Sequence, residues 1–277
     1  MEDFFMRFLF HFFQHINILS IDIVAGAVAS ALFFGRIFQV QIKPIGLVAL
    51  GLTVWVIYTI DHLRDATKIA HPAATLRHRF HQENFGSLLF FLAIAILADA
   101  VAIFFIRRQV FEWGLMLTSV VTLYLVFHRS LRFLKELFVA SLYTAGVLLL
   151  SVTVTVLDAS TQHYLMIFQF AIAAWTNLVL FSWFDQAFDQ LNDQNSFVTV
   201  MGRKTAQTFL NYLFTVSFLL TTVQLIIASP LMPVLILLLM NAALFLIFVF
   251  RKHLEKDDRY RLIGDAVFLF PSLLLVA

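Results

Sequence analysis

Long apolar runs alternate with short polar segments along almost the whole chain. Eight of these runs contain 17 to 21 mostly apolar residues, and a helix needs about 20 such residues to cross the ~30 Å hydrocarbon core of a bilayer. Helices are expected because lipid offers no hydrogen-bond partner to an unpaired backbone group. A ninth run, Gly264–Ala277, has 14 residues; it would reach only about 21 Å as a helix, so we expect it to stop short or to tilt. The eight longer runs are Ile16–Phe34, Ile42–Ile60, Leu88–Ile106, Phe111–Phe127, Leu137–Leu157, Tyr164–Trp183, Phe209–Ala228 and Leu231–Phe250.

Composition narrows the fold class to a membrane protein. Hydrophobic residues make up 61% of the 277 residues and charged residues only 13%, whereas a soluble domain carries about 25% charged residues. The same composition excludes a disordered chain. Cysteine is absent from the sequence, which excludes disulfides, thiolate catalysis and cysteine-based metal sites. We therefore expect an all-α, polytopic membrane protein with about nine transmembrane helices, forming a single domain over residues 1–277.

The distribution of Lys and Arg predicts the orientation, because these residues favour cytoplasmic segments. With the N-terminus in the cytoplasm, 15 of the 19 Lys and Arg residues fall on that side. The two long connections, residues 61–87 and 185–208, then also lie in the cytoplasm and would cap one end of the bundle. We expect an integral multi-pass protein, placed in the inner membrane if its source is bacterial.

Carboxylates recur at intervals of four residues where each long connection begins. Asp61 and Asp65 follow the second run, and Asp185, Asp189 and Asp193 follow the sixth. If the helices continue past the membrane surface, each set shares one helix face, and stacked like charges there cost a few tenths of a kcal/mol per pair. A cation would offset that repulsion, and Mg²⁺ typically binds one or two carboxylates together with substrate phosphates. The alternative is that these residues are solvated helix ends.

Three motifs in these positions resemble those of the UbiA-type superfamily of intramembrane prenyltransferases. The first family motif, Asn-Asp-x-x-Asp-x-x-x-Asp, falls on residues 57–65, where its last two Asp are Asp61 and Asp65. The second is the Asp185, Asp189, Asp193 series, followed by a segment that ends in Gly202. The third, Tyr-x-x-x-Lys-Arg, falls on residues 124–129. The resemblance covers nearly the whole chain, from about residue 16 to residue 277.

This resemblance implies a fold and a reaction. Nine helices would surround a central cavity that opens to the lipid, and Mg²⁺ with the two Asp motifs would hold an isoprenyl diphosphate donor. The isoprenyl group would pass to an aromatic or other lipophilic acceptor within the bilayer; no nucleic acid is expected. The implied metal ligands are Asp61 and Asp65 for one Mg²⁺ and Asp185 and Asp189 for another, with Asp193 in support. The expected diphosphate-binding residues are Arg64, Arg77, Arg79, Tyr124, His128, Arg129 and Lys135.

Some of these residues have alternative interpretations. Arg77 and Arg79 belong to a basic, aromatic stretch that could cover the site and bind phosphate with their guanidinium groups, or could contact anionic lipid headgroups. Asp22 lies inside the first run, where an acid normally faces a cavity or a partner. Asn177, eight residues before Asp185, could line the same cavity or form an interhelical hydrogen bond.

Two other classes of function remain open at this point. A non-catalytic member of the superfamily would bind a ligand through the same residues without turnover. An ion-coupled transporter would use Asp22, Asp99 and the Asp motifs along an ion path. The clustering of the carboxylates at one membrane face favours the enzyme over the transporter.

Overall fold

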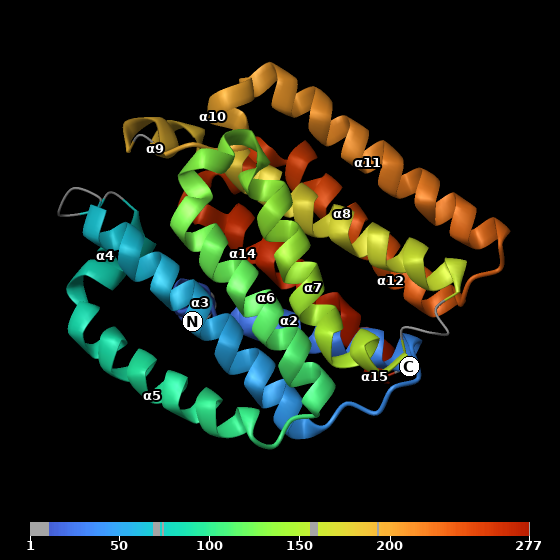
Figure 1. Cartoon of the computed structure of the whole chain (residues 1–277). Helices are drawn as coiled ribbons and strands as arrows, with labels where there is room; N and C mark the ends of the chain where they lie inside the picture. The colour runs from blue at the N-terminus through green and yellow to red at the C-terminus, as the bar shows by residue number, and fades with distance from the viewer. Residues whose placement is uncertain (1–10, 69–72, 74, 156–159, 193, 277) are drawn as a thin grey trace, which may run out of the picture.

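The protein is a bundle of long helices with several short helices at one end (Figure 1). The computed structural model describes residues 11–68, 73, 75–155, 160–192 and 194–276, and within these not the side chains of residues 128–130, 154, 155, 257 and 276. Among the described residues, seven helices are long and apolar enough to cross a membrane, or eight if one bent pair counts as a span. The seven are α3 (Pro44–Lys68), α5 (Phe85–Ile103), α6 (Arg108–Phe127), α7 (Lys135–Thr155), α8 (Thr161–Phe184), α11 (Arg203–Ile226) and α12 (Leu231–Val249).

The first predicted span is not one straight helix. A helix over His11–Ile18 meets α2 (Ile21–Ile37) at an angle of 73°. Ser20 lies between them in the left-handed region, with φ of 57°, and a non-glycine residue in that conformation interrupts helical hydrogen bonding. The apolar run Ile16–Phe34 therefore contains a sharp bend that its apolar pattern does not indicate. Asn17 lies just before this bend.

The ninth predicted segment is broken into short pieces. It comprises part of α14 (Arg259–Ala266), then η3 (Val267–Ser272) and α15 (Leu273–Val276). Pro271 lies inside η3 and has no N–H group to donate to a helical hydrogen bond. The segment packs against α2, so closely that a methyl group on Gly26 would lie 2.9 Å from Cβ of Phe268.

The short helices gather mainly at one end of the bundle. Figure 1 shows α4, α9 and α10 together at that end, and these helices belong to the two long connections for which a cap was predicted. Apart from the three pieces of the ninth segment, the short elements are α4 (Leu76–Glu83), η1 (His128–Leu134), α9 (Gln186–Leu191), α10 (Phe197–Met201), α13 (Arg251–Leu254) and η2 (Lys256–Asp258).

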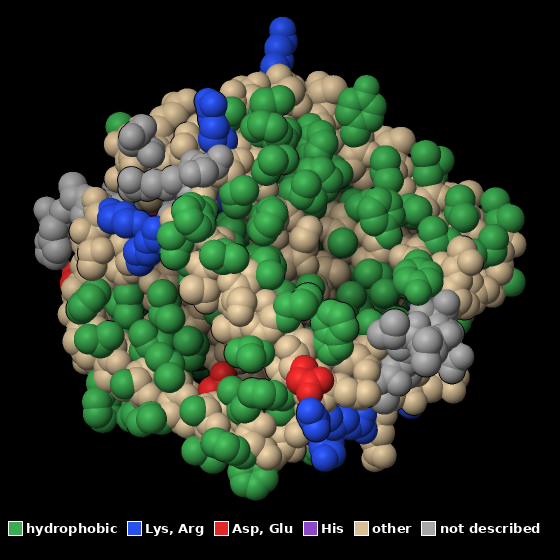
Figure 2. Space-filling model, viewed as in Figure 1, with side chains coloured by type: hydrophobic (Ala, Val, Ile, Leu, Met, Phe, Trp, Pro, Cys, Tyr) green, Lys and Arg blue, Asp and Glu red, His purple; other side chains and the backbone are tan. Residues whose placement is uncertain are grey.

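Burial separates an inner helix from the outer ones. α8 is central, with Met166, Phe170 and Leu180 almost completely buried. In contrast, α5 and α6 expose large apolar side chains such as Phe90 and Trp113. Figure 2 shows hydrophobic side chains spread over the visible face, with Lys and Arg near its borders. A surface of this kind suits contact with lipid rather than water, which confirms the predicted class of helical integral membrane protein.

Candidate functional site

The first carboxylate pair lies near the end of α3. Asp61 and Asp65 are one helical turn apart and half-buried. Both charges act on the phenol of Tyr124 in α6, and Lys135, the first residue of α7, lies within electrostatic reach of Asp65. Tyr124 and Lys135, both predicted to bind the diphosphate, thus lie near the carboxylate pair of α3.

The second carboxylate pair lies where α8 ends. Asp185 joins α8 to α9, and the N–H group of Asp189 donates to the carbonyl of Asp185 at 2.8 Å. Burial raises the pKa of Asp189, a hydrogen bond from Ser196 lowers it, and the charge of Asp185 raises it. The net pKa is about 6. Lys135 interacts electrostatically with Asp189 as well as with Asp65. The ammonium group of Lys135 therefore lies within electrostatic reach of both carboxylate sets.

The two capping connections touch each other. The ring of His78 in α4 stacks on Phe188 in α9, with centroids 5.1 Å apart and planes 14° apart. Burial, then the charges of Arg261 and Arg77, lower the pKa of His78 to about 4. His78 is therefore neutral at neutral pH and lies in a region of positive potential.

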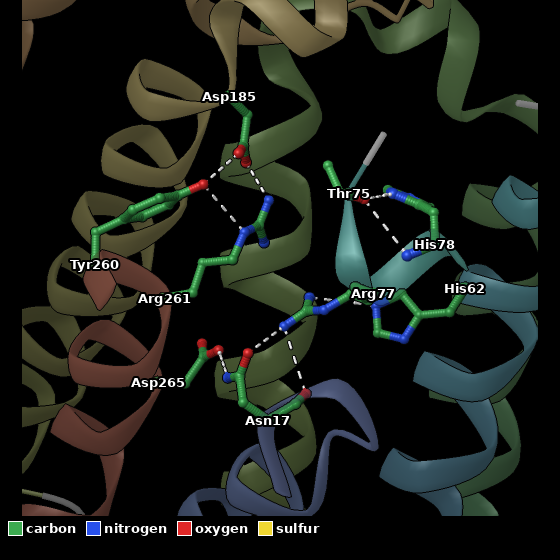
Figure 3. Close-up of polar contacts among 9 residues, drawn as sticks. All are labelled: Asn17, His62, Thr75, Arg77, His78, Asp185, Tyr260, Arg261 and Asp265. Carbon is green, nitrogen blue, oxygen red and sulfur yellow. Dashed lines mark hydrogen bonds and ion pairs between the residues drawn. The ribbon is translucent and has the colours of Figure 1, made fainter. Parts of the chain in front are cut away.

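The C-terminal part of the chain supplies two side chains that bind Asp185 (Figure 3). The hydroxyl of Tyr260 donates to Oδ1 of Asp185 at 2.5 Å, and Nη2 of Arg261 donates to Oδ2 in an ion pair. Burial lowers the pKa of Arg261, but the charge of Asp185, together with Tyr260 and the hydrogen bonds to both residues, raises this pKa above its usual value. Sequence reasoning counted Arg261 only as a cytoplasmic charge. The signal it missed is the pair Tyr260-Arg261 directly before the ninth apolar run.

A second polar group lies beside this one (Figure 3). The amide nitrogen of Asn17 donates to Asp22 at 2.6 Å and to Asp265 at 2.8 Å. Nη2 of Arg77 donates to the amide oxygen of Asn17 at 2.6 Å, and its Nη1 lies 3.5 Å from Nε2 of His62. Asp22 therefore does face partners rather than the membrane surface. Asn17, which the sequence analysis did not select, organises the group because its amide both donates and accepts.

The other predicted residues lie in several places. Nη1 of Arg64 donates to the carbonyl of Leu125 at 2.5 Å, which ties α3 to α6. Arg79 is exposed and donates to the carbonyl of Ala73 at 3.2 Å. Asn177 is buried, and within the described chain its Oδ1 accepts no hydrogen bond. Asp193 and the side chains of His128 and Arg129 lie outside the described residues.

The carboxylates fit Mg²⁺ unequally. In the described part of the chain, His, Asp and Glu side chains form no ready-made group of three that could hold a metal ion. Asp61 and Asp65 still suit Mg²⁺, which needs only one or two carboxylates when phosphates and water complete its shell. Asp185 fits less well, because Tyr260 and Arg261 bind its two oxygens and a metal ion there would lie beside the Arg261 guanidinium.

Comparisons with known proteins identify the fold. No protein-family model and no curated protein match the sequence. A UbiA homologue from Archaeoglobus fulgidus bound to GPP and Mg²⁺ is similar in structure, with a TM-score of 0.66, 12% identity, and coverage of 95% of this chain and 100% of that chain. An Archaeoglobus fulgidus structure bound to DMAPP and Mg²⁺ gives a TM-score of 0.63 at 12% identity, covering 95% and 99%. An apo UbiA homologue from Aeropyrum pernix K1 gives 0.67 at 10% identity, covering 93% and 98%.

These similarities extend over almost the whole length of each chain. At 10–12% identity they concern the fold, and they confirm the fold resemblance that the Asp motifs predicted.

Proposed function

We propose that this chain transfers an isoprenyl group from an isoprenyl diphosphate to an aromatic or other lipophilic acceptor. The observation that carries the proposal is the contact between the two connections that carry the Asp sets, where the His78 ring stacks on Phe188 with centroids 5.1 Å apart and Lys135 lies within electrostatic reach of Asp65 and Asp189. Support for the donor class comes from the fold, because UbiA homologues with the same fold were solved with DMAPP or GPP and Mg²⁺.

The carboxylates would hold the metal ion. Asp61 and Asp65 are proposed as direct ligands of Mg²⁺, while Asp189 would act through bound water, since Mg²⁺ usually retains several waters. Asp193 keeps its predicted supporting role. The ion would neutralise charge on the departing diphosphate when bound.

Basic side chains around the carboxylates would bind and orient the diphosphate. Arg77 and Arg261 face each other from α4 and α14 (Figure 3), and Lys135 lies toward both Asp sets. Fixed positive charges in a partly dry site favour separation of an anionic leaving group more than water does. The other proposed contacts of the diphosphate, or of the connection that covers it, are Tyr124, Arg64, Arg79, His128 and Arg129.

A turnover assay tests the function. Protein in lipid nanodiscs is incubated with radiolabelled DMAPP or GPP, candidate lipophilic acceptors and Mg²⁺, and both released diphosphate and labelled product are measured. We expect Asp61→Asn and Asp65→Asn to lower the rate by at least tenfold. Asp99→Asn is the matched control: this acid accepts a hydrogen bond from Thr53 at 2.7 Å, and Thr53 lies two helical turns before Asp61.

The outcomes separate the alternatives. Magnesium-dependent product formation that disappears only in the Asp61 and Asp65 variants supports the enzyme. Tight binding of the diphosphates without any turnover would instead support a non-catalytic binding protein. A chain that neither binds nor releases diphosphate in its folded state contradicts the proposed site.

A further inference from the structure

Asp185 has its charge compensated inside the protein. Both of its oxygens accept hydrogen bonds, one from Tyr260 and one from Arg261. The side chain of Arg261 is 24% exposed and that of Asp185 is 18% exposed, so the pair lies mostly out of solvent. A metal ion bound to Asp185 would lie beside the guanidinium of Arg261, and repulsion between these like charges in a partly buried site disfavours its binding.

Aromatic contacts hold Arg261 and Tyr260 in this arrangement. The Tyr260 ring stacks on Phe184, with centroids 4.1 Å apart and planes 14° apart. The guanidinium of Arg261 lies 5.3 Å from the centre of the Phe181 ring, a cation–π distance. Phe181 and Phe184 belong to the last turn of α8, directly before Asp185, so the partners are fixed to the same helix end.

Arg261 keeps a donor that could meet a ligand. Its Nε donates to the Tyr260 hydroxyl at 3.2 Å and its Nη2 to Asp185, while Nη1 makes no hydrogen bond within the described part of the chain. Arg77 lies within electrostatic reach of Arg261, and Figure 3 shows the two guanidinium groups near each other, one from α4 and one from α14. Two planar cations in this relation match the oxygens of a diphosphate.

We infer that Arg261 takes the place of a metal ion at Asp185. The chain then binds one divalent cation, at Asp61 and Asp65, and holds the other side of the diphosphate through Nη1 of Arg261. The inference rests on the proposed function and replaces the two-ion site that the sequence resemblance implied with one ion and one fixed guanidinium.

Counting bound ions tests this directly. Mn²⁺ and inorganic diphosphate are dialysed to equilibrium against protein in nanodiscs, and both are quantified per chain. We expect one Mn²⁺ for the wild type, one for Arg261→Lys, and two for Arg261→Gln, since only the last removes the positive charge from Asp185. Tyr260→Phe is a further control and should retain one ion, because it removes a hydrogen bond but leaves the ion pair.

Asp185→Asn keeps the test decisive if Arg261→Gln does not fold. An amide oxygen still accepts from Arg261, so the variant should bind one Mn²⁺ with an affinity within about threefold of the wild type. Two ions in the wild type, or loss of Mn²⁺ in Asp185→Asn, would overturn the inference while leaving the proposed function standing. Absence of any Mn²⁺ in the folded wild type with diphosphate would contradict the proposed function itself.

A separate site lies on another side of α8. A pocket of about 380 Å³ is lined by Trp183, Arg203, Lys204, Gln207 and Arg251. It has three cationic groups and no carboxylate in its lining. These residues come from the end of α8, the start of α11 and the first residue of α13, which follows α12, so the pocket lies where three spans end.

The lining contains an indole donor without an acceptor. Trp183 is only 4% exposed, and its Nε1 has no hydrogen-bond partner among the residues that the structure describes. The guanidinium of Arg203 lies 4.7 Å from the centre of the Trp183 ring, and that of Arg251 lies 4.9 Å from the Phe248 ring. Aromatic rings therefore hold two of the three cationic side chains that line the pocket.

We propose that this pocket binds the phosphate of an anionic phospholipid headgroup. Basic pockets between helix ends on the cytoplasmic side suit such headgroups, and this is the side predicted from the Lys and Arg distribution. Exposed apolar side chains of the adjoining helices, including Phe218 and Phe245, offer a surface along which acyl chains can lie.

Lipid exchange tests the proposal. Protein is placed in nanodiscs of phosphatidylcholine alone or with 30% phosphatidylglycerol, and retained lipid is measured by native mass spectrometry. We expect selective retention of phosphatidylglycerol, reduced at least fivefold in the Arg203→Gln, Arg251→Gln double variant and unchanged in Lys252→Gln, whose side chain is exposed outside the pocket. Equal retention in both variants would overturn the site. Displacement of the lipid by millimolar inorganic phosphate would overturn its assignment to phospholipid.

Discussion

Replacing Gly264 with alanine should displace the helix that carries Arg261. A methyl group at Gly264 would lie 2.6 Å from Oδ1 of Asn177 and 2.7 Å from Cε1 of Phe181, about 0.8 and 0.7 Å inside the 3.4 Å at which ordinary contact begins. Asn177 and Phe181 belong to α8, the most buried of the seven long helices that the structure describes. The clash is therefore expected to be relieved by movement of α14 rather than of α8.

The size of that movement gives the expected loss. A shift of about 0.8 Å would stretch the 2.8 Å bond between Asn17 and Asp265 to about 3.6 Å, where it is no longer a hydrogen bond. Loss of a hydrogen bond to a charged group costs about 1.5–3 kcal/mol, and overpacking costs about 1–3 kcal/mol. A more favourable helix propensity returns up to about 1 kcal/mol. We expect a net loss of roughly 2–5 kcal/mol.

Thermal unfolding in detergent, followed by tryptophan fluorescence, measures the effect. Gly86→Ala is the matched control, because Gly86 also lies in a helix but has no atom within 4 Å of the added methyl group. That variant should unfold at or slightly above the wild-type temperature. Affinity for inorganic diphosphate should fall in Gly264→Ala, since Arg261 moves with α14. If Gly264→Ala unfolds at the temperature of Gly86→Ala, the close packing of α14 on α8 is wrong.

Three further predictions follow from single contacts. Because the pKa of Asp189 is about 6, its carboxyl gains a proton as the pH falls through that value; calorimetric Mn²⁺ affinity with diphosphate should weaken there, and the weakening should be smaller in Asp189→Asn, whereas an identical pH profile would count against its role. The pKa of His78, about 4 because of burial and of Arg261 and Arg77, should rise when diphosphate neutralises those charges, and an NMR titration that shows no change would contradict that location. Glu136 accepts from the N–H of Phe197 at 2.7 Å, so Glu136→Ala should lose about 1–3 kcal/mol of stability, and Glu136→Gln, which keeps an acceptor, should lose less; equal unfolding temperatures would disprove the capping role.

The spans and the shared helix face of Asp61 and Asp65 could be predicted because both depend on local patterns. Apolar runs of about 20 residues have few alternatives to membrane helices, and carboxylates at four-residue intervals lie on one helix face. Asp61 and Asp65 illustrate this, since α3 continues through both residues to Lys68.

Features that depend on tertiary contacts could not be predicted. The bend at Ser20 follows no proline or glycine signal, and it accompanies the contact of Asn17 with Asp265, 248 positions away. Arg261 looks like one of many cytoplasmic cations until α14 packs on α8 and brings it to Asp185. The sequence resemblance consequently implied a second metal at a carboxylate that an arginine engages.

The central claim is that a diphosphate binds between the α3 carboxylates and the two arginines. Crystals grown with Mn²⁺ and geranyl diphosphate, measured at the manganese absorption edge, test it most directly. We expect one anomalous peak beside Asp61 and Asp65, with the diphosphate extending from it toward Arg261 and Arg77. A diphosphate bound elsewhere, or a manganese peak at Asp185 with Arg261 displaced, would contradict this arrangement.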